Sequence, residues 1–292
     1  MASSPDAASF TRHRYGRWAA GPLLGQGSLG PVFLAHDGAG RAAALRVVHA
    51  SLAGDQEFRT RFAREVHAIG AVRGPRIAAL VDADPRGAVP WLATEYVPGP
   101  TLATRVRDLG GPLGAPELRA LASALAGALN DIHRAGLVHG GLRPSKVILA
   151  ADGPRVVDFG TRTQGGTRGG GTSYTAPEVL AARGGVAKPP ADVFALGAVL
   201  AFAATGRGGF TPEGGNPALP GVPRELLPLI TACLAGHPAA RPAPRTVARM
   251  AGLPLPGSRR RALTLAGTLF LAQLAAEAGP LGGRWRSRTG ER

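Results

Sequence analysis

The stretch LVHGGLRPSKVIL, residues Leu137–Leu149, followed after a short turn by VVDFG, residues Val156–Gly160, decides the fold. One apolar run ends the first segment, another begins the second, and residues 150–155 between them hold an Asp-Gly-Pro turn signal. This pattern predicts two short strands, each preceded by a polar loop. We expect the polar side chains of these loops to gather at one edge, where a reaction site would lie: His139, Arg143, Lys146 and Asp158.

The two segments resemble the catalytic loop and the metal-binding loop of the protein kinase family, whose motifs read H-R-D-L-x-x-x-N and D-F-G. The second motif is intact, and the resemblance makes Asp158 the expected metal ligand. In the first motif His139 is kept, but Gly140 and Gly141 replace the Arg and the catalytic Asp. Lys146 replaces the Asn. The two motifs of a kinase site are therefore recognisable, but some of the residues that carry out its chemistry are replaced.

Upstream, Gly25, Gly27 and Gly30 form a G-x-G-x-x-G pattern, a weak signal by itself in a chain with 43 glycines. A dinucleotide-binding fingerprint requires a helix directly after the glycines. Residues 31–50 instead predict a strand, a glycine turn and a second strand. Two strands joined over the phosphates are similar to the glycine-rich loop of kinases.

The second of these strands, Ala42–His49, carries Arg46 where the resemblance places the family's phosphate-contacting lysine. A helix is predicted over Gln56–Val72, because four apolar residues fall at helical spacing. They are Phe58, Phe62, Val66 and Ile69. By resemblance, Glu65 lies where the family's lysine-pairing glutamate lies. It either pairs with Arg46 or is a surface glutamate, and its position relative to the other motifs favours the pair.

Two further strands, Ile77–Asp82 and Val89–Tyr96, complete a predicted five-stranded N-terminal sheet. The resemblance implies that Thr94 is the gatekeeper and that Glu95–Val97 is the hinge that meets an adenine ring. It implies further nucleotide contacts from Val32, Ala44 and Ile148.

From Ala115 onward the pattern is helical. The first helix has one apolar face, made of Leu118, Leu121, Ala122, Leu125, Leu129 and Ile132. Asp192–Thr205 is apolar nearly all round but too short to cross a bilayer, so it predicts a buried helix with Asp192 as its N-cap. Leu226–Leu234 and Thr246–Leu253 predict two more helices.

The resemblance extends over nearly the whole chain. Residues 176–178, Ala-Pro-Glu, match the end of a kinase activation segment, and the resemblance makes Arg241 the buried partner of Glu178. We therefore expect an α+β, protein-kinase-like bilobal fold with one helix beside the N-lobe sheet and a mainly helical C-lobe. The expected divisions are a disordered leader at 1–14, the N-lobe at 15–97, the C-lobe at 98–256 and a basic and apolar tail at 257–292.

The composition is biased toward Ala, Gly, Pro and Arg, and Lys146 and Lys188 are the only lysines. The net charge is +15, of which seven Arg and two Glu from Ser258 onward contribute +5. No basic run is interleaved with aromatic residues, so we expect diffuse solvated charge and no nucleic-acid partner. The single cysteine, Cys233, excludes an internal disulfide and is expected in the core.

The N-terminus lacks a charged segment followed by an apolar one, so we expect a cytosolic domain without a secretory signal. A membrane contact is expected, if anywhere, through residues 259–277. The apolar run Ala262–Ala276 has 15 residues. Its helical length is roughly 22 Å, short of the ~30 Å of a bilayer core. An interfacial or docked helix, a true span and a disordered tail all stay open.

Three changes argue against ordinary phosphoryl transfer. Gly141 has no side chain to accept the substrate proton, and losing a positioned base typically costs ~10²–10⁴-fold in rate. Lys146 puts a cation that cannot coordinate Mg²⁺ at a metal-ligand position. Arg46 keeps the charge of a lysine, but its planar fork is not an equivalent substitute.

The sequence therefore predicts a pseudokinase of the bacterial, actinobacterial Ser/Thr kinase type. By resemblance it binds ATP, with Mg²⁺ weakened or dispensable, and acts in signalling by docking a protein partner. One alternative is an active, atypical Ser/Thr kinase, and another is a membrane-surface scaffold that acts through its tail. Lys146 either reaches Asp158 or the nucleotide phosphates in place of the metal, or is a solvated loop lysine.

Overall fold

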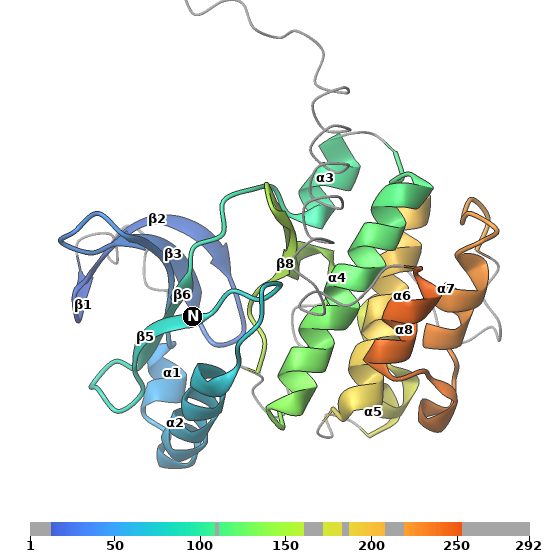
Figure 1. Cartoon of the computed structure of the whole chain (residues 1–292). Coiled ribbons are helices and arrows are strands. Elements are labelled where there is room, and N and C mark those ends of the chain that lie inside the picture. Colours follow the sequence, from blue (N-terminus) through green and yellow to red (C-terminus); the bar gives the residue numbers. More distant parts are fainter. Residues whose placement is uncertain (1–12, 109–110, 161–171, 183–186, 208–218, 253–292) are drawn as a thin grey trace, which may run out of the picture.

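The computed structural model describes residues 13–108, 111–160, 172–182, 187–207 and 219–252. The predictions for the tail at 257–292, and for residues 1–12 of the leader, lie outside these ranges, whereas Arg14, the last residue of the predicted leader, lies in a strand. Figure 1 shows two lobes, one built mainly of strands and the other mainly of helices. This arrangement confirms the predicted α+β bilobal fold.

A six-stranded antiparallel sheet in the order β1-β2-β3-β4-β6-β5 forms the first lobe. Its strands are β1 (Arg14–Tyr15), β2 (Trp18–Gln26), β3 (Pro31–His36), β4 (Ala42–Val47), β5 (Leu80–Asp84) and β6 (Trp91–Glu95). The five predicted strands are present, together with the two-residue β1. The predicted start of β5 at Ile77 was wrong, because Ile77 and Ala78 pair with Val156 of the other lobe instead.

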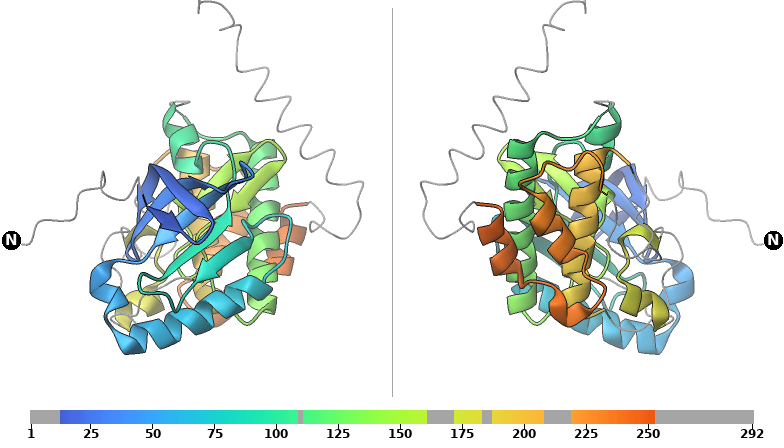
Figure 2. Two further views of the ribbon diagram at one scale, coloured as in Figure 1. Left: turned by 90° about the vertical axis from the view of Figure 1, so that its left-hand side faces the viewer. Right: turned by 90° about the vertical axis from the view of Figure 1, so that its right-hand side faces the viewer.

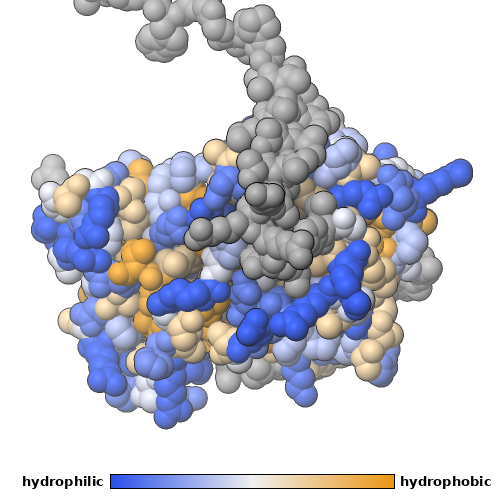
Figure 3. Space-filling view, in the orientation of Figure 1, coloured by the Kyte–Doolittle hydropathy of each residue, from blue (hydrophilic) through white to orange (hydrophobic). Residues whose placement is uncertain are grey.

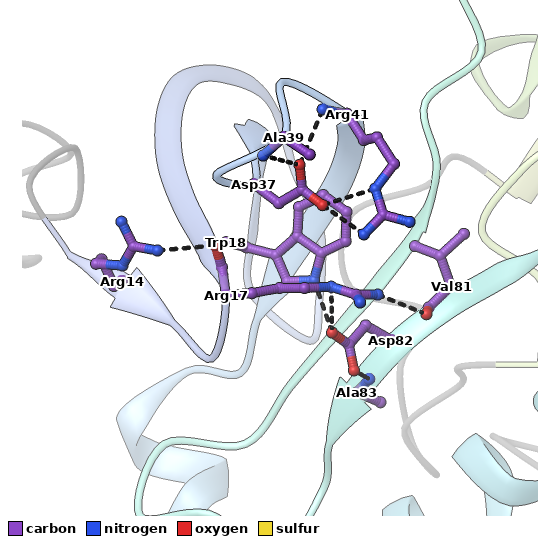
Figure 4. Close-up of polar contacts among 9 residues, drawn as sticks. All are labelled: Arg14, Arg17, Trp18, Asp37, Ala39, Arg41, Val81, Asp82 and Ala83. Atoms are coloured by element: carbon purple, nitrogen blue, oxygen red, sulfur yellow. Dashed lines mark hydrogen bonds and ion pairs between the residues drawn. The ribbon is translucent and has the colours of Figure 1, made fainter.

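Polar contacts join the two ends of this sheet and curl it (Figure 4). Asp82, on the edge strand β5, accepts a 3.0 Å hydrogen bond from the indole Nε1–H of Trp18. Its carboxylate also lies 3.0 Å from Nε of Arg17, whose guanidinium stacks over the Trp18 ring. Arg17 donates a further hydrogen bond to the carbonyl oxygen of Val81. The turn between β1 and β2 is thereby fastened to β5.

Helix α2 (Gln56–Ala71), preceded by the short α1 (Ala50–Ala53), packs against the sheet. Asp55 caps its first turn, and the predicted apolar face is buried. Leu29, at the tip of the glycine-rich loop, is buried in the same hydrophobic cluster as this face. The position of the loop is therefore set by its packing on α2.

The second lobe is mainly helical. Its described helices are α3 (Leu102–Asp108), α4 (Ala115–Arg134), α5 (Pro177–Ala181), α6 (Pro189–Thr205), α7 (Leu227–Cys233) and α8 (Pro244–Met250). Figure 2 shows α4, α6, α7 and α8 side by side. The predicted apolar face of α4 is buried, and α6 is buried nearly all round. These two helices supply nearly half of the buried residues in the largest hydrophobic cluster described.

The predicted role of Asp192 as a helix cap was wrong. Helix α6 begins at Pro189 with Lys188 as its N-cap, because proline suits the first turn of a helix, where its missing N–H is not needed. Asp192 lies inside that first turn and is 1% exposed. Its carboxylate is used instead to hold the loop that follows α4.

The hairpin predicted from the opening stretch consists of β7 (Val147–Ala150) and β8 (Gly153–Val156), preceded by the 3-10 turn η2 (Pro144–Lys146). Two further 3-10 turns are η3 (Thr172–Tyr174) and η5 (Pro238–Ala240). After η5, Arg241 forms the predicted buried ion pair with Glu178, with two hydrogen bonds of 2.7 and 2.8 Å. This pair joins α5 to the end of the lobe.

Hydrophilic side chains are spread over both lobes on the face seen in Figure 3 rather than gathered in one patch. Cys233 is fully buried, as predicted for a small core residue. Among the described segments, no helix combines the length and the apolar character needed to cross a membrane.

We predict that Asp82→Ala lowers the free energy of unfolding by about 1–3 kcal/mol, because the indole N–H of the buried Trp18 loses its acceptor. Arg17→Ala removes a partly exposed ion pair together with the surface contacts of Arg17 to Trp18 and Val81, and should cost about 1 kcal/mol or less. Denaturant unfolding of both variants measures the difference. Equal losses would mean that the ion pair, and not the indole hydrogen bond, closes the sheet.

Candidate functional site

A cavity of about 420 Å³ lies between the two lobes. Its lining includes most of the residues singled out from the sequence. These are Gly25, Val32, Ala44, Arg46, Thr94, Glu95, Val97, Arg143, Lys146, Ile148 and Asp158. The sheet supplies the first six, Val97 lies just after its strand β6, and the loop and hairpin of the second lobe supply the last four, so the cavity exists only where the lobes meet.

Five of the residues expected at the site do not line the cavity: Gly27, Gly30, Glu65, His139 and Gly141. The two glycines shape the loop above it. A Cβ on Gly30, where φ is +148°, would collide with the carbonyl oxygen of Val47, and a Cβ on Gly27 would lie 2.5 Å from Nη1 of Arg46. Gly30 therefore needs glycine, whereas a side chain at Gly27 would require the end of the Arg46 side chain to move.

Phe159 of the D-F-G motif also lines the cavity. The sequence did not point to several other lining residues, namely Leu24, Gln26, Ile69, Leu92, Gly99, Thr101, Ser145 and Val157. Leu24 and Val157 adjoin recognised motifs and could have been found by adjacency. Ile69 was assigned only to the apolar face of α2, because periodicity shows that a residue is buried and not what it faces.

The centre of the site is an ion-pair network around Asp158. Nη2 of Arg46 lies 2.7 Å from Oδ1 of Asp158, and Nζ of Lys146 lies 3.1 Å from Oδ2. The contact expected between Lys146 and Asp158 is therefore present. Asp158 is also the one described non-glycine residue with a positive φ, 62°. A backbone held in this sparsely populated region is typical of functional sites.

The two cations control the charge of Asp158. Burial by itself would raise the pKa of this carboxyl, but the charges of Lys146 and Arg46 outweigh burial and hold the pKa well below its usual range. Burial lowers the pKa of the Lys146 amine, and Asp158 opposes that effect. At physiological pH the carboxylate is thus ionised and held in ion pairs with Arg46 and Lys146.

The favoured pairing of Arg46 with Glu65 was wrong. Arg46 turns to Asp158, because its long planar fork reaches that carboxylate and Gly27 leaves room for it. Within the described residues, Glu65 makes no ion pair of its own. Burial raises the pKa of the Glu65 carboxyl to about 7, although the nearby charge of Arg61 opposes this.

The loop before the hairpin is held by Asp192 of α6. Its two carboxylate oxygens accept 2.8 Å hydrogen bonds from the backbone N–H groups of His139 and Gly140, and Oδ2 also lies 2.8 Å from Nε2 of His133. Gly140 has a φ of 72°, a region that favours glycine. The loop shape therefore does not require the Arg and Asp that the family places here.

Neither His139 nor Gly141 supplies an accessible general base. The ring of His139 is 1% exposed, and neither ring nitrogen has a hydrogen-bond partner in the described part of the chain. Burial, assisted by the charge of Lys146, lowers the pKa of His139 to about 4, so the ring is neutral at physiological pH. A Cβ at Gly141 would lie 3.3 Å from Nζ of Lys146, which therefore lies directly beside this position.

Protein kinases generally use ATP and Mg²⁺, and the residues here fit the two unequally. Mg²⁺ prefers several oxygen ligands. Asp158 already contacts two cations, and no group of three or more His, Cys, Asp or Glu side chains in the described segments is placed to hold a metal. A nucleotide fits better: apolar side chains line one part of the cavity, and Arg46, Arg143 and Lys146 line another.

A two-lobed fold with an apolar and cationic cavity between the lobes defines a protein-kinase-like domain. The protein kinase domain family matches residues 18–250, so the chain belongs to the protein kinase family. A serine/threonine-protein kinase AfsK from Streptomyces griseus is 46% identical over 242 residues, which cover 75% of this chain and 30% of that protein. The probable serine/threonine-protein kinase PkwA from Thermomonospora curvata is 42% identical over 247 residues, 78% of this chain and 33% of PkwA.

Solved structures agree with this assignment. The crystal structure of the PknI kinase domain from Mycobacterium tuberculosis has a TM-score of 0.69 and 27% identity to this chain. The match covers 86% of this chain and 99% of that domain. The family and the resemblance to actinobacterial Ser/Thr kinases are thus confirmed, while the chain spans only about a third of the curated relatives' length.

We predict that Glu65→Gln stabilises the protein increasingly as the pH rises from 5 to 8. The raised pKa means that the folded state keeps a proton on Glu65 that the unfolded state loses above its ordinary value of 4.5. Wild-type stability therefore falls as the pH rises from about 4.5 to about 7, and the glutamine variant lacks this loss.

Thermal unfolding of wild type and variant across this pH range measures the effect. Glu57→Gln, on the same helix but with a side chain that is 88% exposed, is the matched control and should show no such growing advantage. A Glu65→Gln effect that is constant with pH would contradict the assignment.

Proposed function

We propose that this protein binds a nucleotide between its lobes without transferring a phosphoryl group, and acts in signalling by docking a protein partner. The observation that carries the proposal is the neutralisation of Asp158 by Arg46 and Lys146 beside the bare Gly141 position. Kinases need that carboxylate for the metal and a second one for the substrate proton. Here the first is occupied by protein cations and the second is missing.

No other carboxylate of the cavity replaces the missing base. Among the described lining residues only Asp158 and Glu95 carry carboxylates. Glu95 lies on the hinge side and forms a 2.7 Å ion pair with Arg155. A general base must be within hydrogen-bond reach of the proton that it removes and free to accept it. Neither group meets both conditions, which supports binding without transfer.

Nucleotide binding is supported by the division of the cavity. Leu24, Val32, Ala44 and Ile148 give one part an apolar surface suited to a flat base. The cations Arg46, Arg143 and Lys146 suit phosphate groups in the other part. A protein partner is proposed because a kinase fold without transfer retains only binding as its means of signalling.

An active Ser/Thr kinase is the second candidate. It is favoured by the name of the relative AfsK, a serine/threonine-protein kinase at 46% identity. The intact Glu178–Arg241 pair also fits a working C-lobe. If the protein is an active kinase, a general base other than the residue at position 141 would take the proton from the substrate.

A phosphotransfer assay with radiolabelled ATP, on generic substrates and on the protein itself, separates the two candidates. We predict no incorporation by wild type above that of Asp158→Ala. We also predict that Arg46→Lys, Gly141→Asp and Lys146→Asn together raise transfer by about 10² or more, since they restore the family's motif residues. Wild-type incorporation that Asp158→Ala abolishes would sink the proposal of binding without transfer.

A further inference from the structure

We propose that Arg46 and Lys146 take the place of the divalent cation, so that the cleft binds a nucleoside polyphosphate free of Mg²⁺ and added Mg²⁺ weakens the binding. This inference rests on the proposed nucleotide binding and specifies the ionic form of the ligand.

Both oxygens of Asp158 are already used. Oδ1 lies 2.7 Å from Arg46 Nη2, and Oδ2 lies 3.1 Å from Lys146 Nζ. A Mg²⁺ ion would need carboxylate oxygens at about 2.1 Å and would meet two positive charges in the same place. Binding the metal would therefore require both side chains to leave their shared partner.

Arg46 is part of the fold rather than a mobile surface group. It lies on β4, paired with Val32 of β3 on one side and Leu92 of β6 on the other. Its side chain is 9% exposed. The guanidinium lies under the glycine-rich loop in the space that a Cβ on Gly27 would approach within 2.5 Å. The cation is thus held between the loop and Asp158, where phosphates and metal meet in an ordinary kinase.

The charges at this end of the cavity favour a highly charged anion. Among the described lining residues, Arg46, Arg143 and Lys146 stand against one unshared carboxylate, Asp158, because the other, Glu95, is paired with Arg155. Hydrogen bonds from guanidinium and ammonium groups to phosphate are among the strong ones. Metal-free ATP carries more negative charge than its Mg²⁺ complex. The three cations therefore attract the Mg²⁺ complex less strongly, and the space beside Asp158 that its metal ion would need is already occupied.

The apolar part of the cavity selects among polyphosphates. Leu24, Val32, Ala44 and Ile148 offer a surface that inorganic polyphosphate cannot use, whereas a nucleoside base can. We therefore assign the ligand as a nucleoside di- or triphosphate.

Calorimetry on the full chain tests this assignment, with ATP, inorganic tripolyphosphate and adenosine each titrated in EDTA and in MgCl₂. For wild type we expect ATP to bind about tenfold more tightly in EDTA, a difference of about 1.4 kcal/mol. Lys146→Asn restores the family's metal ligand and should reverse the order, so that Mg²⁺ tightens binding. Lys188→Asn, at the only other lysine, which is exposed at the start of α6, should behave like wild type.

The outcomes are distinct. No binding of ATP in either buffer would overturn the proposed nucleotide binding itself. Binding by wild type that requires Mg²⁺, or is tightened by it, would overturn only the metal-free assignment. Tripolyphosphate that binds as tightly as ATP would overturn the choice of a nucleoside ligand.

Amine-selective labelling of wild type, read by peptide mass spectrometry, gives a second readout that does not depend on how Lys146→Asn folds. Only two lysines are present in the chain, so each site is resolved separately. ATP in EDTA should reduce labelling of Lys146 at least about tenfold relative to Lys188. Equal labelling with and without ATP would overturn the proposal that Lys146 meets the phosphates.

Discussion

The carboxylate of Asp158, held between Arg46 and Lys146, is the interaction on which the site depends. It joins a strand of the first lobe to the loop and hairpin of the second. Because Arg46 is used here, Glu65 of α2 is left without an ion pair in the described structure and takes a raised pKa. Because Lys146 is used here, a protein cation lies beside the carboxylate that corresponds to the family's metal ligand.

The fold tolerates these changes because the loop is anchored by different atoms from those that do chemistry. Asp192 binds backbone N–H groups of His139 and Gly140, which every residue type but proline supplies. The side chains at positions 140 and 141 are not part of this anchor. A kinase-shaped cleft is therefore compatible with glycine at both of these positions.

Much of the fold was predictable from the sequence, because the order of motifs and the apolar spacing of α2 and α4 are local signals. The contact between Lys146 and Asp158 was predictable, because one of only two lysines in the chain occupies a metal-ligand position of the motifs while the metal-binding Asp is retained. Arg46 was misassigned because motif alignment gives a position in the chain and not the reach of a longer side chain. Asp192 was misread because its residue type suits a cap equally well, and only the tertiary fold shows that it faces the loop.

We infer that protein cations, and not a metal, neutralise Asp158 when nucleotide is bound. Crystals grown with ATP and MnCl₂ test it directly, through anomalous scattering from manganese. The account predicts no manganese peak beside Asp158, with Nζ of Lys146 lying between that carboxylate and a phosphate oxygen. A manganese peak at about 2.2 Å from an Asp158 oxygen, with Lys146 displaced, would contradict it.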